Sequence, residues 1–165
     1  SIEKNKWSQI NTEDIPPTPR DRHVSIVHKD SIFIFGGYDG FNWVNDFFEF
    51  NILQNSWQEV LCSGWGSPPT PRHSHSAVIY NENMYIFGGY DGKYKNDFYK
   101  FNFSTNEWSE IVPLNEQVVW PKARYRTYCI VYKDQMFIFG GHDGSKQLND
   151  FFSYDFKSKS WTEIC

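Results

Sequence analysis

The heptapeptide IFGGYDG occupies residues 34–40 and returns, letter for letter, at residues 86–92. A third copy, IFGGHDG, fills residues 138–144 with one substitution. Successive copies start 52 residues apart. A constant spacing of this length is typical of a repeat protein, in which each repeat folds as one supersecondary unit.

Further landmarks keep the same period. An arginine lies sixteen residues before the first glycine of each pair, and an aspartate lies eleven residues before a tryptophan. The arginines are Arg20, Arg72 and Arg124, the aspartates are Asp46, Asp97 and Asp150, and the tryptophans are Trp57, Trp108 and Trp161. Each unit therefore contains an arginine, a glycine pair, an aspartate and a tryptophan in that order.

Between these landmarks, short runs rich in Val, Ile, Phe and Tyr are separated by turn residues, and no window keeps helical periodicity over three turns. The pattern predicts strands at 24–28, 32–37, 47–52 and 57–60, then 76–80, 84–89, 98–103 and 108–111, then 128–132, 136–141, 151–156 and 161–164. Four short antiparallel strands in about fifty residues describe one blade of a β-propeller. We therefore predict an all-β chain of three four-stranded antiparallel blades.

The glycine pair is expected to serve the scaffold. A glycine at the end of the second strand permits a positive φ or a close backbone approach that a side chain would obstruct. The Asp-Gly that follows is typical of a tight turn. Each blade needs this corner once, which explains why the phrase recurs once per blade.

The order PTPR…H…IFGGYDG…ND…W resembles the kelch repeat, from Pro16 to Trp161. Its long PPTPR segment is more similar to the kelch propellers of leucine-zipper-like regulators and host-cell-factor-like proteins than to the compact BTB-linked type. The third copy departs from the pattern, with WPKAR for PPTPR and Thr127 in place of His23 and His75. The resemblance implies a module that binds other proteins, in some members selecting substrates for an assembly such as a ubiquitin ligase.

The whole chain, residues 1–165, is thus expected to be a kelch-type propeller segment. Residues 1–15 are assigned to an extra N-terminal outer strand of a preceding blade, with Trp7 packed in it, and a linker. The three blades are assigned to residues 16–61, 62–112 and 113–165. Three blades are too few for a ring, because propellers typically have about four to eight. We favour a fragment of a larger propeller over the alternative, self-association of two copies through open blade edges.

Composition excludes several classes of partner. The formal net charge is −4, which gives no general attraction to nucleic acid or to an anionic membrane surface. No apolar run is long enough to span a bilayer, and no signal peptide opens the sequence. The three cysteines, Cys62, Cys129 and Cys165, are odd in number and irregularly spaced. They favour reduced thiols in a cytoplasmic or nuclear protein.

Loop lengths suggest which rim binds a partner. The distances from each arginine to its glycine pair and from each aspartate to its tryptophan are constant, whereas the connections after the second and fourth strands vary in length. Antiparallel order places both variable connections on the same rim. Binding groups are usually carried by variable loops on a rigid scaffold, so we predict that this rim binds a protein or peptide.

Cationic and aromatic residues are interleaved on that rim, and the aromatics include Trp65, Trp120 and Tyr125. This composition is typical of protein-binding hot spots. The charges of the rim loops sum to −1. Once the repeated aspartates of the corners are set aside as turn formers, the remaining side chains lean basic, which suggests an acidic partner. The candidate contacts are Arg20, Arg22, Tyr38, Trp43, Arg72, His73, Tyr90, Tyr94, Arg124, Arg126, His142 and Gln147.

The repeated arginines have two interpretations. The kelch resemblance implies that they, and the residue after each glycine pair, line the channel mouth, where a cationic ring contacts acidic peptides. Alternatively, the arginines pair with the repeated aspartates as part of the scaffold. Trp43 and Tyr94 are the favoured contacts, because they differ between blades and no shared structural task is expected of them.

An enzymatic function is the alternative. Some kelch-type propellers are copper oxidases, and His73 and His75 could lie on one face of a strand. No further ligands are indicated, and His75 matches His23 in the repeat, which favours a structural role. No nucleophile elbow, P-loop or zinc-protease motif is present. We therefore expect no catalysis, cofactor or metal, with a metal-dependent oxidase or other small-molecule enzyme as the alternative.

Overall fold

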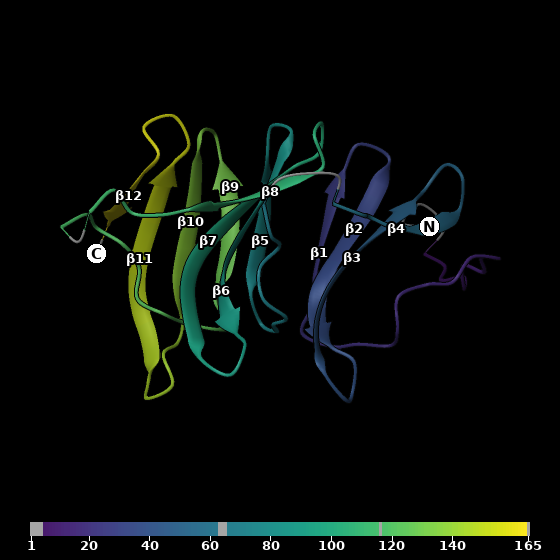
Figure 1. Ribbon diagram of the computed structural model, residues 1–165, viewed down its shortest axis with the longest axis horizontal. Coiled ribbons are helices and arrows are strands. Elements are labelled where there is room, and N and C mark those ends of the chain that lie inside the picture. The colour runs from purple at the N-terminus through teal and green to yellow at the C-terminus, as the bar shows by residue number, and fades with distance from the viewer. Residues whose placement is uncertain (1–4, 63–65, 116, 165) are drawn as a thin grey trace.

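The computed structural model describes residues 5–62, 66–115 and 117–164, which form three four-stranded antiparallel sheets (Figure 1). The first blade contains β1 (Val24–His28), β2 (Ser31–Tyr38), β3 (Trp43–Asn51) and β4 (Ser56–Glu59). The second contains β5 (Ser76–Tyr80), β6 (Asn83–Tyr90), β7 (Tyr94–Asn102) and β8 (Glu107–Ile111). The third contains β9 (Tyr128–Tyr132), β10 (Gln135–His142), β11 (Gln147–Asp155) and β12 (Ser160–Glu163). Trp65 and Cys165 lie outside the described residues.

The predicted fold class is confirmed, and all twelve predicted strands of the three blades are present. The third strand of each blade starts four residues earlier than predicted, because pairing continues past the glycine pair. In the first blade the register shifts between Phe35 and Gly37, and pairing then resumes with Gly37 opposite Val44 and continues to Tyr38 opposite Trp43. Such a bulge bends the strand without ending it.

The expected outer strand around Trp7 is not formed in the structure. Residues 6–10 have no strand assignment, and the Trp7 side chain is fully exposed. An outer strand pairs only with the third strand of its own blade, and no described residue supplies one. None of the described residues forms a helix of the length and apolarity needed to cross a membrane.

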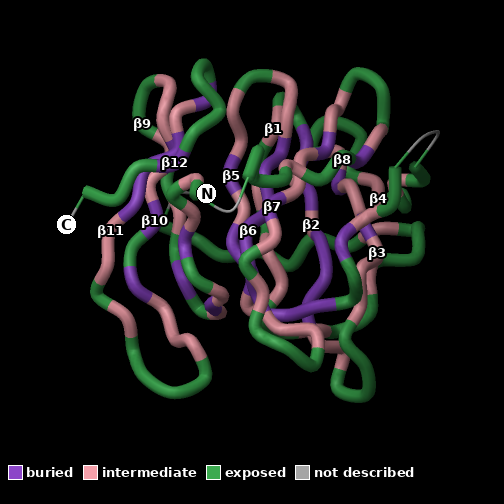
Figure 2. Tube along the Cα trace, turned by 60° about the vertical axis from the view of Figure 1, so that its left-hand side comes forward, coloured by how far each residue is buried: buried purple, intermediate pink, exposed green. Residues whose placement is uncertain are grey.

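The buried residues lie along the strands of the blades (Figure 2). The core lies between the blades, where aromatic rings of neighbouring sheets contact one another. Between the first two blades, Phe35 and Phe47 contact Trp108 at ring distances of 5.1 and 5.9 Å. Between the second and third blades, Phe87 and Phe98 contact Trp161 at 5.5 and 5.4 Å. The repeated tryptophan is thus the packing residue of the inter-blade core.

The glycine pair holds each blade against the next one, as expected of scaffold residues. Gly37 and Gly89 have φ values of +106° and +100°, and their N–H groups donate to the Arg72 and Arg124 carbonyl oxygens of the following blade at 2.8 and 2.9 Å. A Cβ atom at Gly88 would lie 2.7 Å from the Arg124 carbonyl oxygen. A side chain there would therefore separate the two blades.

The inner strands β1, β5 and β9 are adjacent and line an open cavity of about 400 Å³, the partial channel. The turns after β2, β6 and β10 lie along one edge, the lower edge in Figure 1. The segments that precede β1, β5 and β9 end at the same edge. We call this edge the variable rim; it comprises residues 20–23, 38–43, 72–75, 90–95, 122–127 and 142–147.

Candidate functional site

The repeated arginines hold the variable rim together from inside. The Arg72 guanidinium donates to both carboxylate oxygens of Asp97, at 2.6 and 2.8 Å, and to the Gly88 carbonyl oxygen at 2.9 Å. Its Nε donates to the Thr70 carbonyl oxygen at 3.1 Å. One side chain thereby ties the segment before β5 to the end of β6 and the start of β7.

The other two blades repeat this arrangement. Arg20 donates to both oxygens of Asp46, and Arg124 donates to both oxygens of Asp150. Arg72 and Arg124 have no exposed surface, and the Arg20 side chain is 3% exposed. The prediction that Arg20, Arg72 and Arg124 contact a partner as a cationic ring is contradicted by this burial, because acceptors of their own blade already saturate them. Each repeated arginine instead pairs with the repeated aspartate of its own blade, as the scaffold interpretation expects.

Aromatic side chains form a continuous track across all three blades at the variable rim. We call Trp43, His73, Tyr90, Tyr94, Tyr125 and His142 the rim aromatic cluster. Trp43 contacts Tyr90 edge-on at 5.4 Å, and Tyr90 contacts Tyr94 at 5.1 Å. Tyr94 lies 5.3 Å from Tyr125, which lies 5.7 Å from His142. The structure thus brings together five of the predicted site residues and Tyr125.

Trp43 and Tyr94 are the accessible members of the cluster, with exposed fractions of 39% and 37%. Their other faces are used for packing: the Trp43 ring lies over Gly92 and the Tyr94 ring lies over Gly144, in each case a turn glycine of the next blade. The prediction that these two residues share no structural task is therefore wrong. Each closes an inter-blade seam and still presents a ring to solvent.

Arg22, Ser74 and Arg126 occupy equivalent positions at the mouth of the partial channel. All three have a positive φ, between 54° and 55°, and lie at its rim together with the lining residues His23 and His75. The Ser74 N–H donates to the Arg22 carbonyl oxygen at 2.8 Å, and the Arg126 N–H donates to the Ser74 carbonyl oxygen at 2.9 Å. The backbone is fixed by these bonds, while the two arginine side chains are exposed.

The rim aspartates are occupied by the turns. The Asp39 carboxylate accepts the N–H groups of Phe41 and Asn42, and these two bonds lower the pKa of Asp39. Asp143 accepts the N–H groups of Ser145 and Lys146 in the same way, and its pKa is also lowered. Both carboxylates are therefore charged at neutral pH and belong to the turns.

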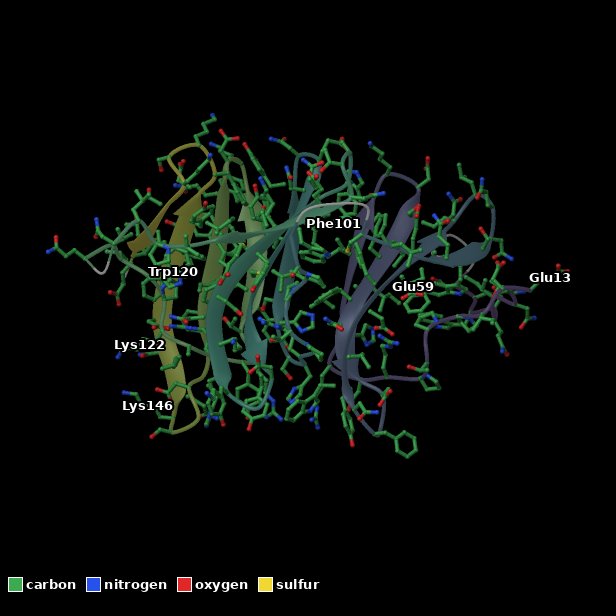
Figure 3. All side chains as sticks on the ribbon, viewed as in Figure 1. Glu13, Glu59, Phe101, Trp120, Lys122 and Lys146 are labelled. Atoms are coloured by element: carbon green, nitrogen blue, oxygen red, sulfur yellow. The ribbon has the colours of Figure 1, made fainter. Side chains whose placement is uncertain are left out.

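The rim cations divide into two groups. Lys95 lies 3.3 Å from the Asp91 carboxylate, so its charge is partly compensated. Lys146 projects from the β10–β11 turn at the lower edge (Figure 3). Among the described residues, no ion pair is formed by Lys93, Lys122, Arg126 or Lys146, and Arg22 has only a 3.6 Å contact with the adjacent Asp21. The exposed charge of the rim is therefore mixed, because the carboxylates of Asp21, Asp39 and Asp143 keep their negative charges beside these cations.

Two histidines and a cysteine line the partial channel. Burial, and next the Arg72 charge, lower the pKa of His75 to about 3, and its Nε2 donates to the Phe35 carbonyl oxygen at 3.1 Å. Burial also lowers the pKa of His23. Burial raises the pKa of the Cys129 thiol to about 12, which leaves it protonated and unreactive. In the described part of the chain, no group of three or more His, Cys, Asp or Glu residues could hold a metal ion.

The remaining candidates take local roles. The Tyr38 hydroxyl donates to the Gly40 carbonyl oxygen at 2.8 Å, and the His142 Nδ1 accepts the Gly144 N–H at 2.9 Å. Gln147 pairs with His142 at the start of β11, in the position that Trp43 and Tyr94 occupy in their blades. The aromatic track consequently ends at the third blade.

Two further aromatic residues lie near the rim, Trp120, which the sequence indicated, and Phe41, which it did not. Trp120 is fixed by donation from its Nε1 to the Asn96 carbonyl oxygen at 2.7 Å, beside the second blade. Phe41, which was not selected, is largely exposed and lines a rim pocket of about 650 Å³ with Arg22, Trp43 and His73. The residues equivalent to Phe41 in the other two blades are Lys93 and Ser145. Trp43 was selected because it differs between blades, and the same criterion would have selected Phe41.

The repeat geometry agrees with the comparison with known proteins. The chain matches the family model described as the KLHDC2/KLHL20/DRC7 Kelch-repeats domain over residues 1–119 and again over residues 65–165. The chain belongs to this kelch-repeat family. The resemblance predicted from the IFGGYDG phrase is therefore confirmed.

Several relatives are similar along almost the whole chain. A leucine-zipper-like transcriptional regulator 1 homolog of Drosophila melanogaster is 34% identical over 169 residues, which cover 96% of this chain and 17% of that protein. Kelch domain-containing protein 1 of Mus musculus is 29% identical over 184 residues, covering 96% of this chain and 45% of that protein. The chain thus spans less than half the length of both. An N-(sulfonatooxy)prop-2-enimidothioate sulfolyase of Thlaspi arvense is 37% identical over 113 residues, covering 66% of the chain and 31% of that enzyme.

Proposed function

We propose that this kelch segment is a non-catalytic protein-interaction module that binds a partner peptide or domain on the variable rim. The observation that carries the proposal is the rim aromatic cluster, which crosses all three blades with Trp43 and Tyr94 partly exposed. Tyrosine, tryptophan and arginine are the side chains enriched in binding hot spots, because they bury large areas at a low entropic cost. The blades hold these rings in fixed positions, so little order is lost on binding.

The partner is proposed to be acidic. Arg22 and Arg126 flank the channel mouth with exposed side chains, and among the described residues their one ion pair is the 3.6 Å contact between Arg22 and Asp21. The Arg126 guanidinium lies 4.8 Å from the Tyr125 ring centroid, so an acidic side chain could meet a cation and an aromatic surface together. Charge-assisted hydrogen bonds from guanidinium to carboxylate are among the stronger polar contacts in proteins.

Selection from a random linear peptide library on the immobilised 165-residue chain tests the aromatic part of the proposal. Peptides that bind the wild-type chain are expected to lose at least about tenfold in affinity for the Trp43→Ala/Tyr94→Ala double variant. The matched control is Trp7→Ala, which removes an exposed tryptophan outside the rim. Equal loss in the control, or full binding by the double variant, would place the binding surface elsewhere.

A charge reversal tests the acidic part separately. Arg126→Glu is expected to weaken the selected peptides about tenfold and to remove most of the salt dependence of binding. The control is Lys159→Glu, a cation with almost the same positive φ (56° against 55°) in the β11–β12 turn on the opposite rim. If both variants bind equally well, the partner is not held by rim charge, whatever the result for the aromatic cluster.

An enzyme is the second candidate, favoured by the similarity to the sulfolyase of Thlaspi arvense. A metal-dependent oxidase would need side chains that bind the metal ion. In the partial channel, the candidates for such ligands are His23 and His75. Metal analysis of the purified protein separates the two functions: copper or iron at one equivalent per chain favours the enzyme.

The wider role proposed for the complete protein is substrate recognition within a larger assembly, such as a ubiquitin ligase, in the cytoplasm or nucleus. It rests on the kelch family and on similarity to leucine-zipper-like and kelch domain-containing proteins, of which the chain covers less than half.

A further inference from the structure

A pocket of about 650 Å³ opens on the variable rim where the β2–β3 turn of the first blade meets the second blade. Its lining residues are Arg22, Tyr38, Phe41, Asn42, Trp43 and His73. All but His73 belong to the first blade, and His73 lies in the segment before β5. The volume falls within the range of about 300–1,000 Å³ that is usual for binding pockets. The pocket is therefore large enough to take a side chain of a partner.

The pocket coincides with a longer turn in the first blade. Between the glycine pair and the Asn-Asp, the first blade has one residue more than the second. In the second blade, the Tyr90 ring contacts Tyr94 at 5.1 Å and Tyr125 at 6.4 Å. Tyr38 takes the place of Tyr90 in the first blade, and its hydroxyl donates to the Gly40 carbonyl oxygen at 2.8 Å. Within the described ranges, the Tyr38 ring makes neither of the two equivalent ring contacts, so the space between these side chains stays open.

The walls of the pocket are fixed by contacts inside the rim. The Trp43 ring contacts Tyr90 edge-on at 5.4 Å. The Asp39 carboxylate accepts the N–H groups of Phe41 and Asn42 at 2.9 and 2.6 Å, which sets the path of the turn. A group that enters a preformed pocket orders few protein side chains, so little of the binding energy is lost.

Three aromatic rings, those of Tyr38, Phe41 and Trp43, supply the apolar part of the lining. Phe41 is 88% exposed and Trp43 is 39% exposed, so both present ring surface to an incoming group. Aromatic pairs attract each other beyond the area that they bury, because the positive edge of one ring meets the negative face of another. An aromatic ring therefore suits this pocket better than an aliphatic side chain does.

Arg22 is the charged residue of the lining. Burial, and next the charge of Arg22, lower the pKa of His73, so its imidazole is neutral at pH 7. The Arg22 side chain is exposed, and its ion pair among the described residues is the 3.6 Å contact with Asp21. A guanidinium forms charge-assisted hydrogen bonds with carboxylates and also stacks on aromatic rings. The pocket is thus complementary to a ring with a negative charge close to it.

We propose that this pocket receives an aromatic side chain of the partner peptide, and that Arg22 binds an acidic residue next to it in that peptide. The inference rests on the proposed function and names the pair of residues that the rim recognises. Trp43 belongs both to the pocket and to the rim aromatic cluster, so the rest of the peptide continues onto the cluster. Phe41 and Arg22 then determine specificity, and the second blade has Lys93 and Ser74 in their places.

The sequences of the library-selected peptides give the first test. Peptides selected on the wild-type chain are expected to share an aromatic residue beside an acidic one. Changing that aromatic residue to alanine is expected to weaken binding at least about tenfold. Peptides that lack the pair overturn the inference, but they leave the proposed function standing if their binding still depends on Trp43 and Tyr94. A selection that yields no binding peptide overturns both.

A substitution at Phe41 tests the pocket itself. Phe41→Lys introduces the residue that the second blade has at the equivalent position, so the turn is expected to keep its fold. We expect it to weaken the selected peptide at least about tenfold, with no further loss for the peptide whose aromatic residue is already alanine. Ser145→Lys adds the same charge at the equivalent position of the third blade and is expected to leave the affinity unchanged. Equal affinities of these two variants for the selected peptide overturn the inference.

The acidic residue of the peptide is tested through Arg22→Ser. Ser74 occupies the equivalent position of the second blade with almost the same φ, 55° against 54°, so serine fits this backbone. The variant is expected to weaken the selected peptide about tenfold, and to bind the peptide with the corresponding amide in place of the acid as wild type does. Circular dichroism checks that each variant keeps its strands. An equal loss for the acidic and the amide peptide overturns the pairing with Arg22.

Discussion

The variable rim contains two sets of side chains with opposite relations to solvent. The arginines repeat in every blade, are buried, and are saturated by hydrogen bonds from their own blade. The aromatic residues differ from blade to blade, and Trp43 and Tyr94 remain partly exposed. Residues that repeat maintain the blade, whereas the residues that vary on the same rim are those that we propose as contacts for a partner.

The largest effect is expected from breaking a buried ion pair. Arg72→Ala leaves the Asp97 carboxylate without its two guanidinium bonds, and losing one partner of a buried pair typically costs about 3–5 kcal/mol of unfolding free energy. Urea unfolding measures the loss. A change below about 1 kcal/mol would mean that the repeated arginine is not a scaffold residue.

The glycine pair should be nearly as sensitive. Gly88→Ala places a Cβ atom 2.7 Å from the Arg124 carbonyl oxygen and also strains a residue with φ +67°. We expect a loss of about 3 kcal/mol. Gly40→Ala is the control, because φ is +94° but no atom lies within 4 Å of the added Cβ atom. Strain alone should cost about 1–2 kcal/mol there, and equal losses would show that blade contact is unimportant.

His75 should make the protein sensitive to acid. Its folded-state pKa of about 3 lies below the ordinary value of 6.5, so the unfolded chain binds a proton first as the pH falls. Stability is therefore full above the unfolded-state pKa and is lost as the pH falls toward the folded-state pKa. Between about pH 7.5 and about pH 5 the expected loss is about 2 kcal/mol.

The pH experiment has a matched variant. His75→Gln keeps a donor for the Phe35 carbonyl oxygen but cannot titrate. Burial also lowers the pKa values of His23 and His73, which act in the same direction in both proteins. Only the difference between wild type and His75→Gln in the pH dependence of the unfolding free energy is assigned to His75. Identical pH dependence in wild type and variant would exclude the assignment.

The smallest effect on stability is expected at the accessible aromatics. Tyr94→Ala removes an edge contact with Tyr125 and the packing over Gly144, but the ring is already partly exposed. We expect a loss of about 1 kcal/mol, measured as a small fall in the melting temperature. A loss comparable with that of Arg72→Ala would make Tyr94 a scaffold residue, and the contrast between the two sets would fail.

The strands and the repeat were predictable because strand periodicity and a fixed spacing are local signals. The outer strand expected around Trp7 is not formed, because an outer strand depends on a partner strand that no described residue supplies, and the local pattern does not report on that partner. The spacing of the repeat also could not show whether Arg72 faces solvent or pairs with Asp97, because a guanidinium binds carboxylates both inside a protein and at its surface. The packing of Trp43 over Gly92 depends on the position of the next blade, which no local pattern specifies.

The most direct measurement is the affinity of one library-selected peptide, by isothermal titration calorimetry, for Arg72→Ala and for the Trp43→Ala/Tyr94→Ala double variant. Temperature is held below both unfolding transitions. The account predicts that Arg72→Ala, once corrected for its folded fraction, binds as wild type does, while the double variant loses at least about tenfold. Loss of affinity by folded Arg72→Ala, together with unchanged binding by the double variant, would contradict it.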